Sequence, residues 1–186
     1  MTEISLARAP AAPHFPSPSF ARPLDALLAE HNDQYEVCRR LENLAEDLDV
    51  EPMAAEAAAL KSHLTVDLPR HEAFEEQHLF PLLRRRCRPR DRVNSVIARL
   101  YSEHALDDTL VDYIAGDLAL IASGFRLPNP LRLRLNVTSF VASQRRHLAW
   151  ENELVVPLAR RRLTSEDLVG LGACLSMRAR ISALTG

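Results

Sequence analysis

Apolar side chains recur at intervals of three and four residues along most of the chain, and this spacing predicts amphipathic helices. No segment shows the strict alternation of a half-buried strand. Four long helical patterns follow one another through short connections, and a shorter pattern comes after them. They cover residues 23–48, 52–82, 91–123 and 130–158, and the residues after Thr164. We therefore expect an all-α fold, an up-down-up-down four-helix bundle with an additional C-terminal helix.

Residues that favour helix ends support these limits. Pro23 suits the first position of a helix, and Asp91 is placed to cap the third helix at its N-terminus. Gly124 suits the C-terminal cap of the same helix. Thr164 and Asp167 resemble a capping box with aspartate in place of glutamate.

Two prolines lie inside the second helical pattern. Proline lacks the N–H that an α-helix needs, and its ring clashes with the preceding turn. We expect a kink near Pro69 and a distortion or an end near Pro81. In this interpretation Pro81 and the arginines at 84–86 belong to a helix end, where cations interact favourably with the helix dipole.

The chain divides into three parts. Residues 1–22 carry several prolines among alanine and serine, which predicts a flexible N-terminal tail. Residues 23–162 form the predicted bundle. Residues 163–186 form a C-terminal helix that we expect to pack on the bundle.

Composition agrees with a folded helical protein. The chain is 47% hydrophobic and 26% charged, and its net charge of -2 provides no general basic field for nucleic acid. Its three cysteines are too few and too scattered for a disulfide framework. No segment has the pattern of a signal peptide, and no apolar run approaches the roughly 20 residues of a membrane span. We expect a cytoplasmic protein with no nucleic-acid partner and no membrane partner.

Six polar residues interrupt the apolar faces of the four long helices. Positions four residues apart in an α-helix differ by only about 40° around its axis, so each glutamate of an HxxxE pair shares a face with its histidine. Because most of these interruptions lie well inside their helices, an antiparallel bundle can bring them to one level. The set is His31, His71, Glu75, His104, His147 and Glu151.

A buried cluster of this composition requires positive charge. Two carboxylates without a basic partner would repel each other and lose their hydration, at a cost of roughly several kcal/mol each. No apolar face carries a lysine or an arginine. A lone histidine or a single HxxxE pair is more often a core or surface feature, but the full set on four helices offers ligands for two borderline divalent ions. We therefore predict a metal site in which the carboxylates can bridge two ions.

The two HxxxE pairs belong to one repeated segment. Residues 70–86 read RHEAFEEQHLFPLLRRR and residues 146–162 read RHLAWENELVVPLARRR. The segments share Arg, His, Ala, Glu, Pro, Leu and the closing Arg-Arg-Arg in register. Recurrence in register favours a shared role for the His71–Glu75 and His147–Glu151 pairs.

Two polar residues near the predicted ligands are candidates for supporting roles. His78 shares the face of His71 and is an extra ligand, a partner of a ligand, or a hydrogen-bonded core residue. We favour the core residue, because the counterpart of His78 in the repeat is Leu154. Asp108 either orients His104 through the far ring nitrogen or remains solvated.

Two tyrosines also lie close to predicted ligands along the chain. Tyr35 is one turn from His31, and Tyr101 is one turn from His104. A tyrosine hydroxyl there could donate a hydrogen bond to a bound oxygen species. Plain core packing is the simpler interpretation, and we favour it for both.

At these residues the sequence resembles the hemerythrin-like family of HHE cation-binding domains, over about residues 23–162. The family order of histidine, HxxxE, histidine and HxxxE fits the six residues above, and EEQHLFP at 75–81 resembles the EExxLFP signature. The resemblance implies a four-helix bundle around two non-haem iron ions with an oxo or hydroxo bridge. It also implies that the glutamates bridge the ions and the histidines are terminal ligands, with zinc or manganese as substitutes for iron.

The sequence departs from the oxygen-carrying hemerythrins, which use HxxxH on the third helix and HxxxxD on the fourth. Here the residue four positions after His104 is Asp108 rather than histidine, and the residue five positions after His147 is Asn152 rather than aspartate. The order instead resembles the H-HxxxE-H-HxxxE variant of iron–sulfur cluster repair proteins, some mycobacterial hemerythrin-like proteins and the iron-sensing domain of a ubiquitin ligase subunit. That resemblance implies links to oxidative or nitrosative stress, peroxide breakdown and iron sensing.

Three functions follow from the resemblance. The first is a module that binds or senses O2, NO or peroxide, and the second is a di-iron enzyme that decomposes hydrogen peroxide as a catalase does. The third is an iron-responsive interaction module, whose protein partner the sequence does not identify. A ferritin-like bundle fits less well, because it needs ExxH on two helices, and Leu154 breaks the second copy.

Overall fold

The computed structural model describes residues 22–48 and 53–185, so the predicted N-terminal tail lies outside the described residues. Every regular element in these two ranges is a helix. The elements are α1 (Pro23–Glu46), α2 (Ala54–Ser62), the π-helix η1 (His63–Asp67), α3 (Leu68–Phe74), the π-helix η2 (Glu75–Leu79), α4 (Phe80–Arg86), the 3-10 helix η3 (Pro89–Asp91), α5 (Val93–Ala122), α6 (Pro130–Trp150), the π-helix η4 (Glu151–Val155), α7 (Val156–Arg162) and α8 (Ser165–Thr185).

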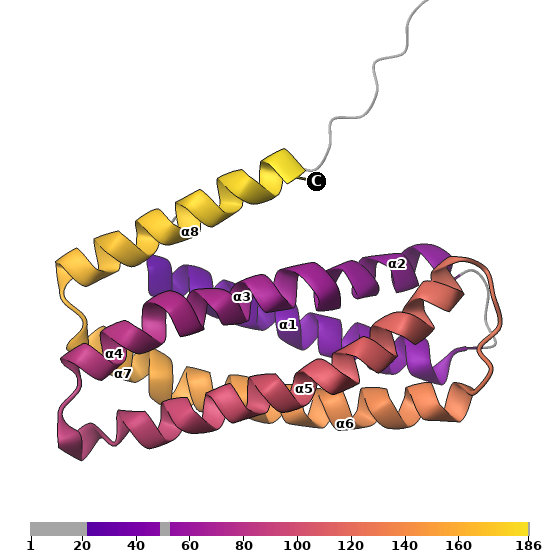
Figure 1. The fold of residues 1–186 in the computed structure, drawn as a ribbon, viewed down its shortest axis with the longest axis horizontal. Helices are drawn as coiled ribbons and strands as arrows, with labels where there is room; N and C mark the ends of the chain where they lie inside the picture. Colours follow the sequence, from indigo (N-terminus) through magenta and orange to yellow (C-terminus); the bar gives the residue numbers. More distant parts are fainter. Residues whose placement is uncertain (1–21, 49–52, 186) are drawn as a thin grey trace, which may run out of the picture.

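These elements form four limbs that pack as a bundle. The second limb runs from α2 to α4 and the fourth from α6 to α7, while α1 and α5 are the first and third limbs. α1 packs against α2 and α6, and α5 packs against the same two helices, so the four limbs close into a ring. Successive limbs run in opposite directions along the long axis, and α8 lies outside the ring at an angle to it (Figure 1). The predicted all-α bundle with a further C-terminal helix is confirmed.

A cap at the C-terminus of α5 explains where this helix ends, and a cap at the N-terminus of α8 explains where that helix begins. Gly124 has a φ of 76°, and the N–H of the next residue, Phe125, donates to the carbonyl of Leu120 at 2.9 Å. At the start of α8 the backbone N–H of Thr164 donates to Asp167 Oδ2 at 2.9 Å, and the N–H of Asp167 donates to Thr164 Oγ1 at 3.2 Å. The predicted glycine cap and the predicted capping box are both confirmed.

The start of α5 differs from the prediction. The residue before α5 is Arg92, in the left-handed conformation with a φ of 51°, so the expected N-cap role of Asp91 is wrong. Asp91 instead closes the 3-10 turn that precedes α5, where its side chain accepts from the N–H of Arg88 at 2.8 Å. Its side chain also accepts a hydrogen bond from Arg162 at 2.7 Å, and this contact links the connection between α4 and α5 to the end of α7.

Three π turns precede prolines inside the second and fourth limbs. η1, η2 and η4 each end two residues before a proline, at Pro69, Pro81 and Pro157. In η2 the N–H of Phe80 donates to the carbonyl of Glu75, five residues back. The extra residue of a π turn moves aside the carbonyl that would otherwise clash with the proline ring. The limb therefore continues to Arg86. Of the two outcomes expected near Pro81, the structure shows the distortion: the proline lies inside the limb, and the arginines at 84–86 form its last turn.

Two apolar clusters fill the bundle, one toward each end. One contains Leu27, Phe80, Ile97, Leu100 and Val155 with residues from α8, and the other contains Leu41, Leu64, Ile114, Val137 and Phe140. Along α5, His104 lies after the last residue of the first cluster and before the first residue of the second. A polar layer thus divides the core across the middle of the bundle. None of the described helices is both long enough and apolar enough to cross a membrane.

Candidate metal centre

All six predicted ligands point into the polar layer at the centre of the bundle. Their exposed fractions lie between 0% and 6%. They come from all four limbs, with one histidine from α1, one from α5, and one histidine and one glutamate from each of the other two limbs. The set is His31, His71, Glu75, His104, His147 and Glu151.

The six residues form two groups of four that share both glutamates. In the first group, His31 and His71 join the two carboxylates, and in the second, His104 and His147 do so. The potential ligand atoms of each group lie within 4.8 Å of one another. Two groups with common carboxylates are the arrangement that a pair of bridged ions needs.

The two oxygens of each carboxylate face opposite histidine pairs. Glu75 Oε1 lies 3.6 Å from His71 Nε2, and Glu75 Oε2 lies 3.9 Å from His104 Nε2. Glu151 Oε2 lies 3.3 Å from His31 Nε2, and Glu151 Oε1 lies 3.3 Å from His147 Nε2. Each glutamate therefore presents one oxygen to each group.

Several of these buried atoms lack a hydrogen-bond partner within the described chain. They are Nε2 of His31 and of His71 and both carboxylate oxygens of Glu75 and of Glu151. Polar atoms buried without partners are costly, and ionised carboxylates more so, unless a cation coordinates them. The donor set of imidazole nitrogens and carboxylate oxygens suits borderline divalent ions, so the residues present fit a metal pair.

The two buried carboxylates behave differently when no cation balances them. Burial raises the pKa of Glu75 well above its ordinary value, and the negative charge of Glu151 raises it further. Burial acts in the same direction on Glu151, but the charges of the surrounding histidines, His147 first, outweigh it and lower the pKa of Glu151. The two carboxylates thus differ in how readily they hold a proton, Glu75 more than usual and Glu151 less, and a bound cation would compete with that proton.

Around the centre, a second ring of side chains accepts a hydrogen bond from Nδ1 of each of the four histidines of the polar layer. His31 Nδ1 donates to Asn152 Oδ1 at 2.6 Å, and His71 Nδ1 donates to Glu30 Oε2 at 2.8 Å. On the other side, His104 Nδ1 donates to Glu76 Oε1 at 2.7 Å, and His147 Nδ1 donates to Glu103 Oε2 at 3.3 Å. With its proton on Nδ1, a neutral imidazole can offer the Nε2 lone pair to a metal; in this structure His104 Nε2 and His147 Nε2 lie 3.2 Å apart, within hydrogen-bond distance of each other.

The sequence analysis did not assign these four supporting residues. Each one is the immediate neighbour of a predicted ligand, as in the pairs Glu30–His31 and Glu103–His104. A polar residue directly beside a predicted ligand in the sequence was therefore the feature that could have identified them. The π turns help to place two of them, because Glu76 and Asn152 are the second residues of η2 and η4, directly after Glu75 and Glu151.

The sequence analysis named four other residues as candidates for supporting roles, namely His78, Asp108, Tyr35 and Tyr101, and the structure places them farther from the centre. His78 is half-buried, packs its ring against Phe74 at 5.7 Å and belongs to neither group of four. Asp108 is exposed, as in the solvated alternative of the sequence analysis, and Glu76 is the carboxylate that accepts from His104 Nδ1. The hydroxyl of Tyr101 donates to the backbone carbonyl of Glu76 at 3.2 Å.

Tyr35 also contacts the second ring rather than the centre. Burial raises the pKa of Tyr35, and the nearby side chain of Asn152, the residue that holds His31, acts against that rise. Both predicted tyrosines thus support residues that orient histidines.

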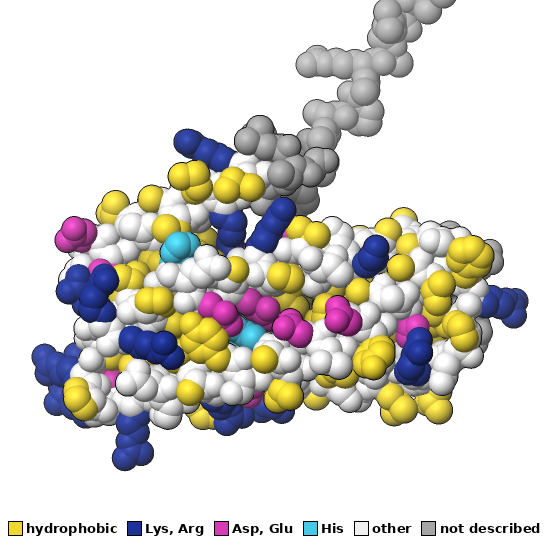
Figure 2. All heavy atoms as spheres, viewed as in Figure 1, with side chains coloured by type: hydrophobic (Ala, Val, Ile, Leu, Met, Phe, Trp, Pro, Cys, Tyr) yellow, Lys and Arg dark blue, Asp and Glu magenta, His cyan; other side chains and the backbone are white. Residues whose placement is uncertain are grey.

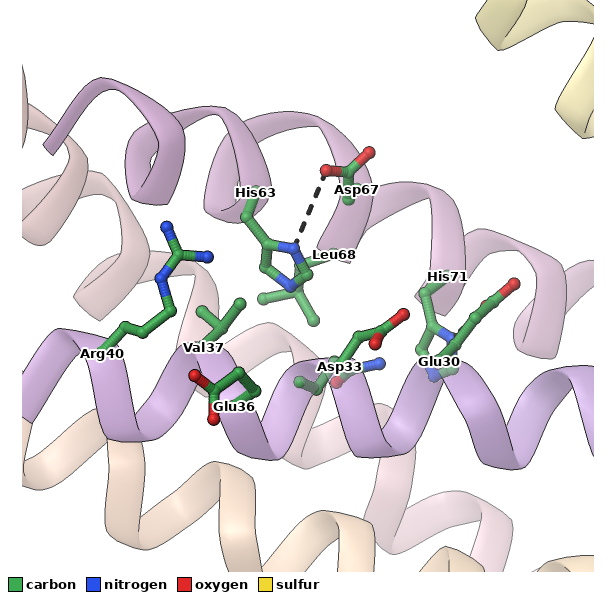
Figure 3. Close-up of a pocket in the computed structure, with 10 residues that line it drawn as sticks. Glu30, Asp33, Glu36, Val37, Arg40, His63, Asp67, Leu68 and His71 are labelled. Carbon is green, nitrogen blue, oxygen red and sulfur yellow. Dashed lines mark hydrogen bonds and ion pairs between the residues drawn. The ribbon is translucent and has the colours of Figure 1, made fainter. Parts of the chain in front are cut away.

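A pocket of about 350 Å³ leads from the surface to one side of this centre, between α1 and the η1–α3 part of the second limb (Figure 3). Its outer wall carries exposed carboxylates, and its inner wall includes buried His71 and Gln34. Gln34 Oε1 accepts from Gln144 at 2.6 Å, while Gln34 Nε2 is buried without a partner in the described chain. The lining residues are Glu30, Asp33, Gln34, Glu36, Val37, Arg40, His63, Asp67, Leu68 and His71.

Acidic side chains also gather over the other side of the centre. Figure 2 shows them in the middle of the visible face, between α3 and α5. Burial first, and then the charge of Asp108, raise the pKa of Glu72 to about 8 in this region. Glu76 and Asp107 add to the same negative field, which favours the approach of cations.

Comparison with known proteins agrees with this geometry. The family model of the hemerythrin HHE cation-binding domain matches residues 22–159. No curated protein gives a significant match. The matched range includes the first three limbs, the fourth limb as far as residue 159 within α7, and all six residues of the polar layer. The chain therefore belongs to the hemerythrin HHE cation-binding domain family and is a metal-binding domain.

Proposed function

We propose that the protein binds two iron ions in the polar layer and uses them to bind or sense O2, NO or peroxide. His31 and His71 would hold one ion, and His104 and His147 the other, with Glu75 and Glu151 shared between them. The observation that carries this proposal is the set of unpartnered buried ligand atoms in two groups with common carboxylates. Zinc and manganese suit the same donors and would be competitors.

The number of protein ligands supports a reactive rather than a purely structural role. Each group offers four residues, whereas non-haem iron commonly takes up to about six ligands. Iron held in this way supplies redox chemistry and open coordination positions for a small molecule. The protein contributes the imidazole orientation, through four hydrogen bonds at Nδ1, and an apolar cluster on each side that excludes bulk water.

A peroxide-decomposing enzyme is the second candidate, and the pocket beside His71 favours it. The walls of this pocket carry several carboxylates, His63 and Arg40, so it suits a small hydrogen-bonding molecule better than an apolar gas. Gln34 Nε2 lies in the same wall as a buried donor with no partner in the described chain. Hydrogen peroxide both donates and accepts hydrogen bonds and fits such a pocket.

Metal content and the visible spectrum of aerobically purified protein test the proposal. We expect about two irons per chain in the wild type, and fewer than two in His71→Ala and in His147→Ala. His78→Ala is the matched control, because His78 lies on the same limb outside both groups of four and should leave the metal content unchanged. Two irons retained in both ligand variants, or a wild type that binds none when supplied with iron, would contradict the site.

Peroxide kinetics then separate the two candidates. Repeated turnover of hydrogen peroxide without an added reductant identifies the enzyme. A single stoichiometric oxidation of the iron, with no further consumption, identifies the sensor.

A further inference from the structure

Arg178 on α8 reaches the polar layer from outside the bundle. Its guanidinium donates to Glu30 Oε1 and to the backbone carbonyl of Arg70, the latter at 3.3 Å. It also lies over the ring of Phe74, 5.2 Å from the ring centroid. The other carboxylate oxygen of Glu30 accepts from His71 Nδ1 at 2.8 Å. A continuous chain of contacts thus runs from α8 through Glu30 to a predicted ligand.

The opposite half of the layer receives no such help from α8. Glu103, which holds His147, accepts from Arg99 at 3.0 Å and from Arg146 at 3.4 Å. Both arginines belong to bundle helices, α5 and α6. Among the described residues, the Glu30 half alone uses an arginine from beyond residue 159, where the family match ends. The two halves have the same kinds of ligand. They differ in the arginines that hold the supporting carboxylate: Glu30 behind His71 is held from α8, and Glu103 behind His147 is held from the bundle.

We infer that Arg178 is a positioning residue for the half of the metal centre that contains His71, and that docking of α8 and metal binding at this half stabilise each other. The inference rests on the proposed metal pair. The guanidinium holds Glu30 Oε1 from one side while His71 Nδ1 donates to Oε2, so the carboxylate is fixed between them, and a fixed carboxylate fixes the ring plane and tautomer of the histidine. Because coupling between two equilibria is reciprocal, a metal that orders His71 must also favour the docked position of α8.

The packing of α8 shows why this contact matters for docking. The first part of the helix is held by Leu171 and Leu175 in the core and by Asp167, which accepts from Arg86 at 2.8 Å. Further along, Met177 is 62% exposed and borders a groove of about 500 Å³ between α8 and the second limb. Arg178 lines the same groove. Residues 177–181 of α8 thus have less apolar burial than the first part, and polar contacts such as that to Glu30 contribute more to their docking.

The test compares two arginines that both anchor α8. Metal-free wild type, Arg178→Gln, Arg178→Lys and Arg86→Gln are each titrated with Co²⁺, and binding is followed by visible absorption. Arg86→Gln is the matched control, because it loosens the start of α8 without touching Glu30 or a histidine. In Arg178→Gln we expect one of the two ions to bind about tenfold more weakly with an altered absorption band, and in Arg178→Lys a smaller loss. Arg86→Gln should bind both ions as the wild type does.

Hydrogen exchange of α8 supplies the reciprocal measurement. Co²⁺ should slow amide exchange in the later part of α8 in the wild type and have a smaller effect in Arg178→Gln. Wild-type affinity for both ions in Arg178→Gln, or an equal loss in Arg86→Gln, would overturn the inference. A wild type that takes up no second ion would instead contradict the proposed metal pair, so the two failures are distinguishable.

Discussion

At the scale of single residues, the centre is built from neighbouring pairs. One member of each pair faces the centre, and the residue beside it holds a histidine from another limb. Three of the four holders are glutamates, and the fourth is Asn152. A carboxylate behind an imidazole makes its free nitrogen more basic, whereas an amide does so less. The two groups of four are therefore unequal, and His31 has the weakest support.

Glu76→Gln tests the value of a carboxylate in this position. The amide oxygen can still accept from His104 Nδ1, but its charge is lost. We expect metal affinity at this half to fall by about tenfold to 100-fold, as measured by competition with a chelator of known affinity. Glu153→Gln removes a charge from an exposed position in the other limb and should have little effect. Equal affinities in the two variants would exclude a role for the carboxylate.

At the scale of elements, the π turns connect the prolines to the centre. Glu75 and Glu151 each open a π turn, and a proline follows six residues later in both limbs. Proline prevents the local return to regular α-helical bonding, because it offers no N–H and its ring needs space. The prolines thus keep two successive residues, such as Glu75 and Glu76, directed toward the layer.

Pro81→Ala should therefore weaken metal binding while leaving the helix content unchanged. Alanine restores the missing N–H and lets the extra residue of the turn move along the limb, which rotates Glu75 away from its place. We expect a loss of metal affinity of several-fold or more by Co²⁺ titration, with unchanged far-ultraviolet circular dichroism. Pro130→Ala is the control, since this proline starts α6 and has no π turn before it. A wild-type affinity in Pro81→Ala would show that packing alone fixes the turn.

At the scale of the whole molecule, the polar layer separates two apolar clusters and joins all four limbs. Without cations, this layer contributes unpartnered polar atoms in the place where a bundle normally buries apolar side chains. Metal binding should therefore account for a large share of the stability of the folded chain.

Removal of metal should lower the melting temperature by several degrees. An ion present at 100 times its dissociation constant adds about 2.7 kcal/mol of stability, which corresponds to roughly 5–10 °C for a chain of this size. The measurement is thermal unfolding before and after dialysis against a chelator, with metal restored afterwards. His71→Ala should show a smaller increase on metal addition than the wild type. Identical melting curves with and without metal would mean that the layer is stable without ions.

Much of the architecture was predictable because it depends on local chemistry. The helical periodicity, Gly124 and the Thr164–Asp167 pair predict elements that the structure contains. The repeated HxxxE pairs, with one histidine on each remaining helix, predict residues that the fold brings together. Their assignment as metal ligands remains a prediction that the titrations above test.

The remaining features depend on tertiary contacts. Whether Pro81 ends a helix or widens it depends on packing of α4 within the first apolar cluster, which periodicity does not reveal. Asp108 and Glu76 are equally polar in sequence, and only the relative rotation of α5 and η2 decides which one meets His104. The contact between Arg178 and Glu30 joins residues far apart in the chain and left no local pattern.

Each group of four also draws on both halves of the chain. The first group needs Glu151 as well as His31 and His71, and the second needs Glu75 as well as His104 and His147. A chain still being synthesised therefore has no complete group until its fourth limb has left the ribosome. If the proposed metal pair is correct, metal capture by the full ligand set is a late event in biosynthesis, and a chain cut short before Glu151 would expose histidines and carboxylates without a complete group.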